Sequence, residues 1–361
     1  MGENMQNDFN EEQSYYGRID YCNNCGQYPI DKSESNHSVL CNRCRNEMIK
    51  YPIPKIFILL GIVILGLIVF SLLELPKDLK DFKIYRKAED KISEGKVNEA
   101  LDDLEKLIKK YPDSDDMPMD AVKYAMENGK YSYAIDIINN SLYGKELMDV
   151  EVEKIESYYD ILEPYRLTEN AYYKILEELD YSLSYEEQNN SIKNSLLALE
   201  GDVNQYKPLL YYLIGVCCTD YDEASQYLVK SLSLDGNLIE SRIELAKILI
   251  CKNQIDEAEV AYNAILKKES DNYEAKSNMA VVYLLKGDNK KAVELAYEAY
   301  ELCDPKEYCV SETLIVALSI DGQADKAQQY INELKELGYD LNEDAKRLID
   351  NQISLEQYYI G

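Results

Sequence analysis

Four cysteines near the start of the chain have a spacing that suits metal binding. They form two C-x2-C pairs, Cys22 with Cys25 and Cys41 with Cys44, and fifteen residues separate the pairs. Two residues between thiolates let a tight turn aim both sulfurs at one ion, and two such pairs supply a tetrahedral all-thiolate shell with Zn–S distances of about 2.3 Å. Gly26 directly after the first pair accepts the positive φ that turns amides toward the sulfurs. The spacing therefore favours zinc.

Other interpretations of these cysteines have to be weighed. His37 could replace one cysteine ligand, but four cysteines already close the site, which favours a surface histidine. The thiols could also form a redox dithiol or two disulfides. A redox C-x-x-C motif needs a thioredoxin-like βαβ context, and none surrounds the first 55 residues.

Residues from Tyr21 to Asn46 resemble the zinc-ribbon family. The resemblance implies a structural Zn²⁺ site whose ligands are Cys22, Cys25, Cys41 and Cys44. Such a closed site has no open coordination position, so it would not be catalytic. We expect the ribbon over 20–50, after a disordered tail over 1–19.

The composition excludes several classes of function. Lys plus Arg number 39 against 67 Asp plus Glu, a formal net charge of -28, which rules out a large electrostatic nucleic-acid footprint. The acidic part suggests basic surfaces as partners, although a solvated helical surface explains it as well. One histidine removes most acid–base chemistry, and the motifs GxxxxGK[ST], HExxH and Gly-x-Ser-x-Gly are absent. We expect neither an enzyme nor a nucleic-acid partner.

An apolar run from Ile56 to Leu73 has 18 residues without a charge. A helix of this length spans about 27 Å, close to the hydrocarbon thickness of a bilayer. The run predicts a single transmembrane helix over 55–75, a cell-membrane location and contact with lipid. Thiols available for zinc argue for a reducing side, which would place the ribbon in the cytoplasm and the rest outside. Five further cysteines beyond the run, an odd number, argue against that orientation.

Alanines recur with a fixed period beyond the apolar run. Ala100 is followed by Ala134 after 34 residues, Ala224 leads to Ala258 and Ala292 in steps of 34, and Ala327 comes 35 later. A period of this size indicates stacked units rather than one closed core. Around each alanine the apolar residues follow helical spacing, and Gly or Pro ends the helices.

This pattern resembles the tetratricopeptide repeat (TPR) family and is strongest over 239–306, although the Trp that often marks its first helix, helix A, is absent. The resemblance implies an all-α fold: a TPR-type α-solenoid of helical hairpins, here preceded by the transmembrane helix and the zinc ribbon, an order that is bacterial in style. The expected divisions are repeats over 81–148, degenerate helical hairpins over 149–206, repeats over 207–341 and a capping helix over 342–361.

TPR proteins hold peptides on a concave face lined by helix A. Only Lys247 and Asn278 fit the residue types of the family's carboxylate clamp, so we assign no clamp. For each candidate groove residue, packing between helices is the competing interpretation. The candidates for partner contact are Tyr85, Tyr212, Ile243, Lys247, Ile250, Asn278 and Leu284.

The sequence thus predicts a membrane-anchored TPR scaffold for protein–protein interactions, with a structural zinc ribbon on the opposite side of the membrane. The alternative is a membrane-tethered regulatory or signalling protein whose ribbon contacts nucleic acid or transcription machinery. The sequence does not fix an oligomeric state.

Overall fold

The computed structural model describes residues 19–33, 35–49, 54–303 and 306–360, and for 72–77 it describes the backbone alone. The chain divides into two units, Met1–Asp78 and Leu79–Gly361. The predicted disordered tail over 1–19 lies outside the described residues, apart from residue 19.

The N-terminal unit folds around its cysteines. An isolated antiparallel bridge joins Tyr21 to Pro29, and Gly26 between them has a φ of +63°. The second cysteine pair lies at the start of helix α1 (Asn42–Ile49). Arg45 on this helix donates from Nη2 to the carbonyl oxygen of Asp31 at 2.6 Å. Over its described residues, the segment 19–49 is thus a bridged turn and a short helix, without a β-sheet.

Helix α2 (Lys55–Ser93) contains the apolar run and corrects the prediction of a membrane anchor. Among the described residues, no helix is both long enough and apolar enough to cross a membrane. The apolar residues begin one continuous helix, which goes on through charged residues such as Asp78 and Lys80. The anchor over 55–75 was therefore wrong. The predicted membrane location, the lipid partner and the two opposite sides depended on it and fall with it.

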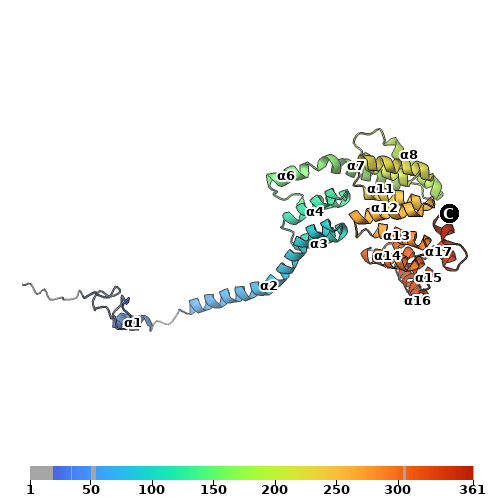
Figure 1. Ribbon diagram of the computed structural model, residues 1–361. Helices are drawn as coiled ribbons and strands as arrows, with labels where there is room; N and C mark the ends of the chain where they lie inside the picture. Colours follow the sequence, from blue (N-terminus) through green and yellow to red (C-terminus); the bar gives the residue numbers. More distant parts are fainter. Residues whose placement is uncertain (1–18, 34, 50–53, 304–305, 361) are drawn as a thin grey trace, which may run out of the picture. The chain divides into compact units, whose positions relative to one another are not determined.

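The C-terminal unit is a succession of helical hairpins (Figure 1). The end of α2 packs on α3, because Ala88 belongs to the same buried cluster as Ala100 and Leu104. The hairpin helices are α3 (Val97–Lys110), α4 (Asp116–Glu127), α5 (Tyr131–Ile137), α9 (Lys207–Val216), α10 (Tyr221–Leu234), α11 (Ile239–Cys251), α12 (Ile255–Lys268), α13 (Tyr273–Leu285), α14 (Asn289–Leu302), α15 (Tyr308–Ile320) and α16 (Ala324–Glu336).

The periodic alanines lie where helices cross closely. Every one of them is buried, with at most 4% of its surface exposed. A small side chain lets two helices approach, and larger residues such as Leu104 and Ile265 fill the space beside it. The core therefore follows the stack as a series of apolar clusters. The predicted all-α, TPR-like repeat solenoid is confirmed.

Turns between the two helices of a repeat use a left-handed residue. Gly287 has a φ of +77°, and Asn253, exactly one repeat earlier, has a φ of +58°. Glycine adopts this conformation without steric cost, and asparagine tolerates it better than most other residues. The turn is thus kept in a repeat where the sequence offers no glycine.

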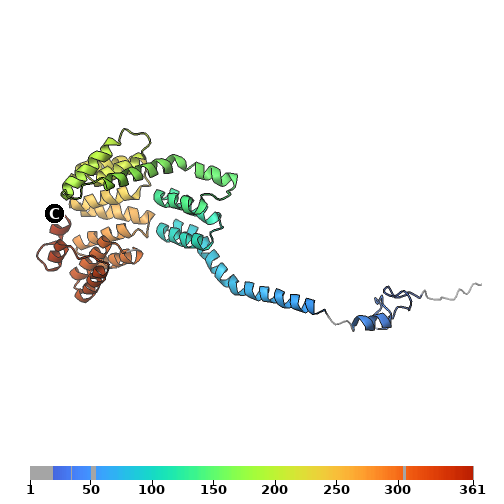
Figure 2. The same cartoon turned by 180° about the vertical axis from the view of Figure 1, so that it is seen from behind.

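Three further helices cover most of 149–206, namely α6 (Asp149–Glu156), α7 (Tyr159–Glu177) and α8 (Tyr185–Ala198). A single π-helical turn, η1 (Ile138–Leu142), precedes them. In the view from behind, this green segment leads from the first hairpins to the yellow ones (Figure 2). Buried Thr168 accepts a hydrogen bond from the backbone N–H of Tyr206 at 2.7 Å, which ties α7 to the start of α9.

The chain ends in two short helices, α17 (Glu343–Ile349) and α18 (Leu355–Tyr359). Helix α18 contacts α13, and the hydroxyl of Tyr358 donates to Oε1 of Glu312 on α15 at 2.6 Å. The C-terminal segment therefore covers part of the first helices of the last two repeats.

Candidate functional site

The four predicted zinc ligands come together. Their sulfur atoms all lie within 4.8 Å of one another, and Cys25 Sγ is 3.8 Å from Cys41 Sγ. In a tetrahedron with Zn–S distances of about 2.3 Å the sulfurs would be about 3.8 Å apart. A disulfide needs its sulfurs at about 2.05 Å, and the cysteines are free thiols. The donor set thus fits a tetrahedral thiolate metal.

Hydrogen bonds and burial act in opposite directions on these thiols. Burial opposes ionisation of Cys22, but backbone N–H groups of Cys41, Cys25 and Asn24 outweigh it and lower its pKa to about 6. The Asn24 side chain favours the thiolate of Cys44, but burial and the neighbouring thiols raise the pKa of Cys44 to about 12. Four thiolates at these distances repel one another unless a cation lies among them.

The predicted partner residues separate into three groups. Ile243, Ile250 and Leu284 are at most 5% exposed and belong to one apolar core cluster. Tyr85 lies in the first repeats, where its hydroxyl donates to Asp120 at 2.7 Å. The remaining three, Tyr212, Lys247 and Asn278, are half-buried on α9, α11 and α13. A role of any of them in partner contact stays a prediction.

Carboxylates that sequence reasoning treated as scattered surface charges accompany these three residues. Glu240 and Glu244 are one helical turn apart on α11, and Glu274 on α13 lies 34 residues after Glu240, at the same repeat position. That spacing was a readable signal. We call the set the acidic face, comprising Tyr212, Glu240, Glu244, Lys247, Glu274 and Asn278.

Electrostatic effects show that members of the acidic face are neighbours. Burial raises the pKa of Glu274, and the carboxylates of Glu244 and Glu240 raise it further against the opposing effect of Lys247. Burial likewise raises the pKa of Tyr212, and the same three glutamates add to it. Burial is also the largest cause of the raised pKa of Glu240. Negative charge on this face is thus disfavoured, because burial removes water that would solvate the carboxylates.

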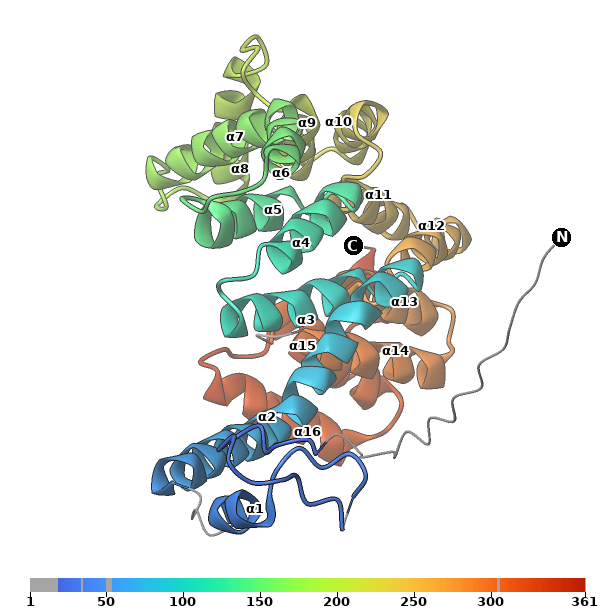
Figure 3. The same ribbon diagram turned by 90° about the vertical axis from the view of Figure 1, so that its left-hand side faces the viewer.

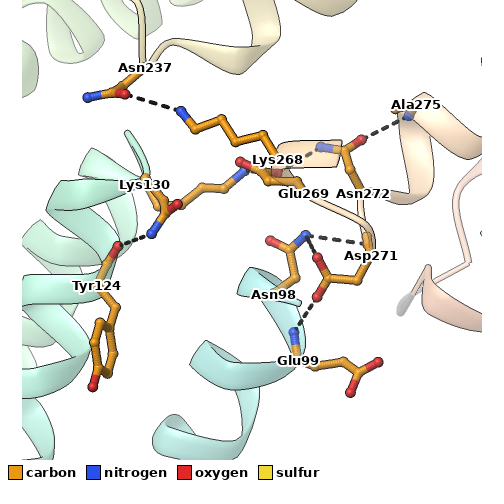
Figure 4. Close-up of polar contacts among 11 residues, drawn as sticks. Asn98, Glu99, Tyr124, Lys130, Asn237, Lys268, Glu269, Asp271, Asn272 and Ala275 are labelled. Carbon is orange, nitrogen blue, oxygen red and sulfur yellow. Dashed lines mark hydrogen bonds and ion pairs between the residues drawn. The ribbon is translucent and has the colours of Figure 1, made fainter. Parts of the chain in front are cut away.

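A second polar cluster joins the first repeats to much later ones (Figure 4). The loop 269–272 between α12 and α13 carries Glu269, Asp271 and Asn272, all buried. Lys130 at the start of α5 lies 3.1 Å from Oε2 of the fully buried Glu269. Since one partner is desolvated, removing the other would leave an uncompensated buried charge.

Asp271 caps a helix from which it is far removed in sequence. The side chain of the N-cap residue of α3, Lys96, makes no capping bond. Instead, Oδ2 of Asp271 accepts a hydrogen bond from the N–H of Glu99 at 2.7 Å, and Asn98 also contacts Asp271 (Figure 4). A carboxylate at this end satisfies a free N–H and complements the helix dipole.

Two glycine turns fit against the loops of the later repeats. The carbonyl oxygen of Gly95 accepts from the N–H of Ser270 at 2.8 Å. A Cβ on Gly129 would lie 2.5 Å from the carbonyl oxygen of Asn237, whereas at Gly287 it would meet nothing within 4 Å. The first hairpins thus lie beside α11–α13 (Figure 3). We call these contacts the closure; local sequence patterns gave no signal for it.

Comparison with known proteins agrees with the repeat pattern. Residues 243–307 match the tetratricopeptide repeat family. This segment contains most of the acidic face. Comparison with curated proteins gives no match.

Several solved structures are similar at low identity. MamA from Desulfovibrio magneticus is 20% identical, with 48% of this chain and 95% of that chain covered and a TM-score of 0.34. A TPR protein from Parabacteroides merdae is 15% identical, with 78% of this chain and 99% of that chain covered and a TM-score of 0.39. YrrB, described as a TPR protein with an unusual peptide-binding site, is 16% identical. The match covers 57% of this chain and 95% of that chain, with a TM-score of 0.29. We draw no functional conclusion from these scores.

Proposed function

We propose that this chain is an interaction scaffold that binds a protein or peptide partner along the acidic face. The observation that carries the proposal is the succession of half-buried polar side chains at matching positions of consecutive repeats, on α11 and α13. Such side chains are partly desolvated and held by rigid helices, so a partner pays little to order them. Tyr212 adds an amphipathic ring of the kind that is enriched at interfaces.

The N-terminal unit is proposed to be a structural zinc site. Zinc would be held by Cys22, Cys25, Cys41 and Cys44, and four thiolates would leave no position for substrate. The first cysteine pair is set by the Gly26 turn and the second by the start of α1. Metal would supply folding energy rather than chemistry.

Photocrosslinking tests the interaction surface. A photoreactive phenylalanine analogue placed at Tyr212 or at Asn278 is expected to crosslink a partner in an extract of the source cells. Val229 on α10 and Val260 on α12 are 56% and 70% exposed, and the same analogue there serves as the matched control. Crosslinks from the control positions alone, or equally from both sets, would contradict the proposal.

A further inference from the structure

The acidic face carries more negative charge than its own cations neutralise. Lys247 Nζ lies 2.8 Å from Oε1 of Glu244 and is therefore engaged. Lys130, whose charge lowers the pKa of Glu240, is already paired with Glu269. Within the described part of the chain neither Glu240 nor Glu274 forms a salt bridge. Among the described residues, two half-buried carboxylates one repeat apart are thus left without a salt bridge.

Two buried polar atoms at this face also have no hydrogen-bond partner among the described residues. One is Oε2 of Glu240, and the other is the hydroxyl of Tyr262 on α12. The Tyr262 side chain is fully buried, and the carboxylates of Glu244 and Glu274 help to raise its pKa, after burial itself. Buried groups of this kind normally find a partner, and leaving one unsatisfied is unfavourable. The oxygen of half-buried Glu240 points to a ligand that supplies donors, whereas the hydroxyl of Tyr262 lies inside the core.

A single metal ion does not fit this face. Over the described ranges, the four cysteines are the one group of three or more ligands close enough to share an ion. The carboxylates of α11 and α13 therefore do not form such a group. Directly packed helices have axes about 8–10 Å apart, a distance that about three extended residues span. The neutralising positive charges must therefore be several cationic groups spaced along a polypeptide.

We infer that the acidic face recognises a basic segment of a partner protein, whose Lys or Arg side chains pair with Glu240 and Glu274. The ammonium or guanidinium donors of that segment pair with these carboxylates and satisfy Oε2 of Glu240. The inference rests on the proposed interaction role of this face and names the chemistry of the partner.

Binding of designed peptides to the full chain tests this. The probe is a short fluorescent peptide with Lys at every third position, because three extended residues span about 10 Å. Peptides with Gln or Glu in place of every Lys are the controls. Only the Lys peptide should bind, and salt should weaken it because the contacts are charged. Equal binding of the Gln peptide would overturn the inference.

Paired variants separate this face from the general acidity of the chain. Glu240→Gln with Glu274→Gln should weaken the Lys peptide on the order of tenfold or more, since hydrogen bonds to charged groups contribute about 1.5–3 kcal/mol each. Glu257→Gln with Glu294→Gln removes the same charge from exposed positions on α12 and α14 and should leave affinity unchanged. Equal weakening by both pairs would show nonspecific attraction and overturn the inference.

Two further measurements keep the result interpretable. The variant with Glu240→Gln and Glu274→Gln should keep the helix content of the unaltered chain by circular dichroism, so that its weaker binding reports lost contacts rather than lost structure. Crosslinks from Tyr212 and Asn278 to a partner, combined with no binding of the Lys peptide, would refute the basic segment while leaving the scaffold function standing. Absence of those crosslinks, together with Lys-peptide binding that depends on Glu240 and Glu274, would refute the proposed scaffold function while leaving recognition of a basic segment standing.

Discussion

The cysteines of the N-terminal unit replace a hydrophobic core. Cys22, Cys41 and Cys44 are the buried apolar residues of its described part, and only Cys25 and Leu40 pack against them. So small a core cannot offset the entropy of ordering the chain without a metal or another crosslink. The unit is therefore expected to fold with zinc and to lose its structure without it.

Removing one sulfur tests this expectation. Cys41→Ser should abolish binding of one zinc ion per chain, measured by elemental analysis. It should also open 19–49 to proteolysis while helical unfolding of the C-terminal unit stays unchanged. Cys309→Ser, at an exposed thiol of the other unit, is the control and should retain zinc. Zinc retained by Cys41→Ser would contradict the four-cysteine site.

The glutamates of the acidic face should give the free chain an unusual pH dependence. The pKa values of Glu240 and Glu274 are raised in the folded state above the ordinary 4.5. The native state then binds more protons than the unfolded state between 4.5 and the raised values, so these groups make stability rise as pH falls through that window. Carboxylates with lowered pKa, such as Glu259, lose their contribution only below their ordinary 4.5.

Urea unfolding between pH 7 and pH 5 measures this effect. The variant with Glu240→Gln and Glu274→Gln should be more stable than the unaltered chain at pH 7, and its stability should rise less on acidification. The variant with Glu257→Gln and Glu294→Gln should keep the original slope. Identical slopes for all three proteins would show that the two acidic-face glutamates are well solvated.

At the scale of helices, the sequence predicted the features that recur with the repeat period. Ala258 and Ala292 recur at the right interval, and both are fully buried at helix crossings. The glycines that mark the turns between helices were a less reliable signal, because Asn253 adopts the left-handed conformation that Gly287 adopts one repeat later. The 34-residue step from Glu240 to Glu274 was visible as well, but periodicity cannot tell a solvated carboxylate from one packed between helices.

Two features of the structure could not be predicted from local sequence patterns. The apolar stretch from Ile56 was judged by its own composition, whereas the helix containing it continues to Ser93. The closure joins residues far apart in the sequence, 139 positions in the case of Lys130 with Glu269. Such a contact depends on the summed rotation from hairpin to hairpin, and each repeat sequence encodes only its contact with the next.

At the scale of the whole C-terminal unit, the closure changes how the solenoid should unfold. A linear array of repeats contacts only its neighbours, so its ends fray independently. Here Asp271 caps α3 and Ser270 bonds to Gly95, which couples the first repeats to the later ones. Opening the first repeats must therefore break their contacts with the α11–α13 loops, and the unit should behave more cooperatively than an open array.

Two glycine substitutions test the closure with one serving as control. Gly129 and Gly287 have φ values of +73° and +77°, so alanine costs roughly 1–2 kcal/mol of backbone strain at either position. Only at Gly129 would the new Cβ collide with Asn237, which adds about 1–3 kcal/mol of overpacking. Gly129→Ala should thus lower the free energy of unfolding in urea clearly more than Gly287→Ala.

Hydrogen exchange locates the difference between these two variants. The amides of Glu99 and Ser270 donate across the closure, to Asp271 and to Gly95. Both should exchange faster in Gly129→Ala and at the original rate in Gly287→Ala, because only the first variant pushes the loops apart. Equal destabilisation with unchanged exchange at both amides would mean that the first repeats do not touch the α11–α13 loops in solution, and the unit would then unfold as an open array of repeats.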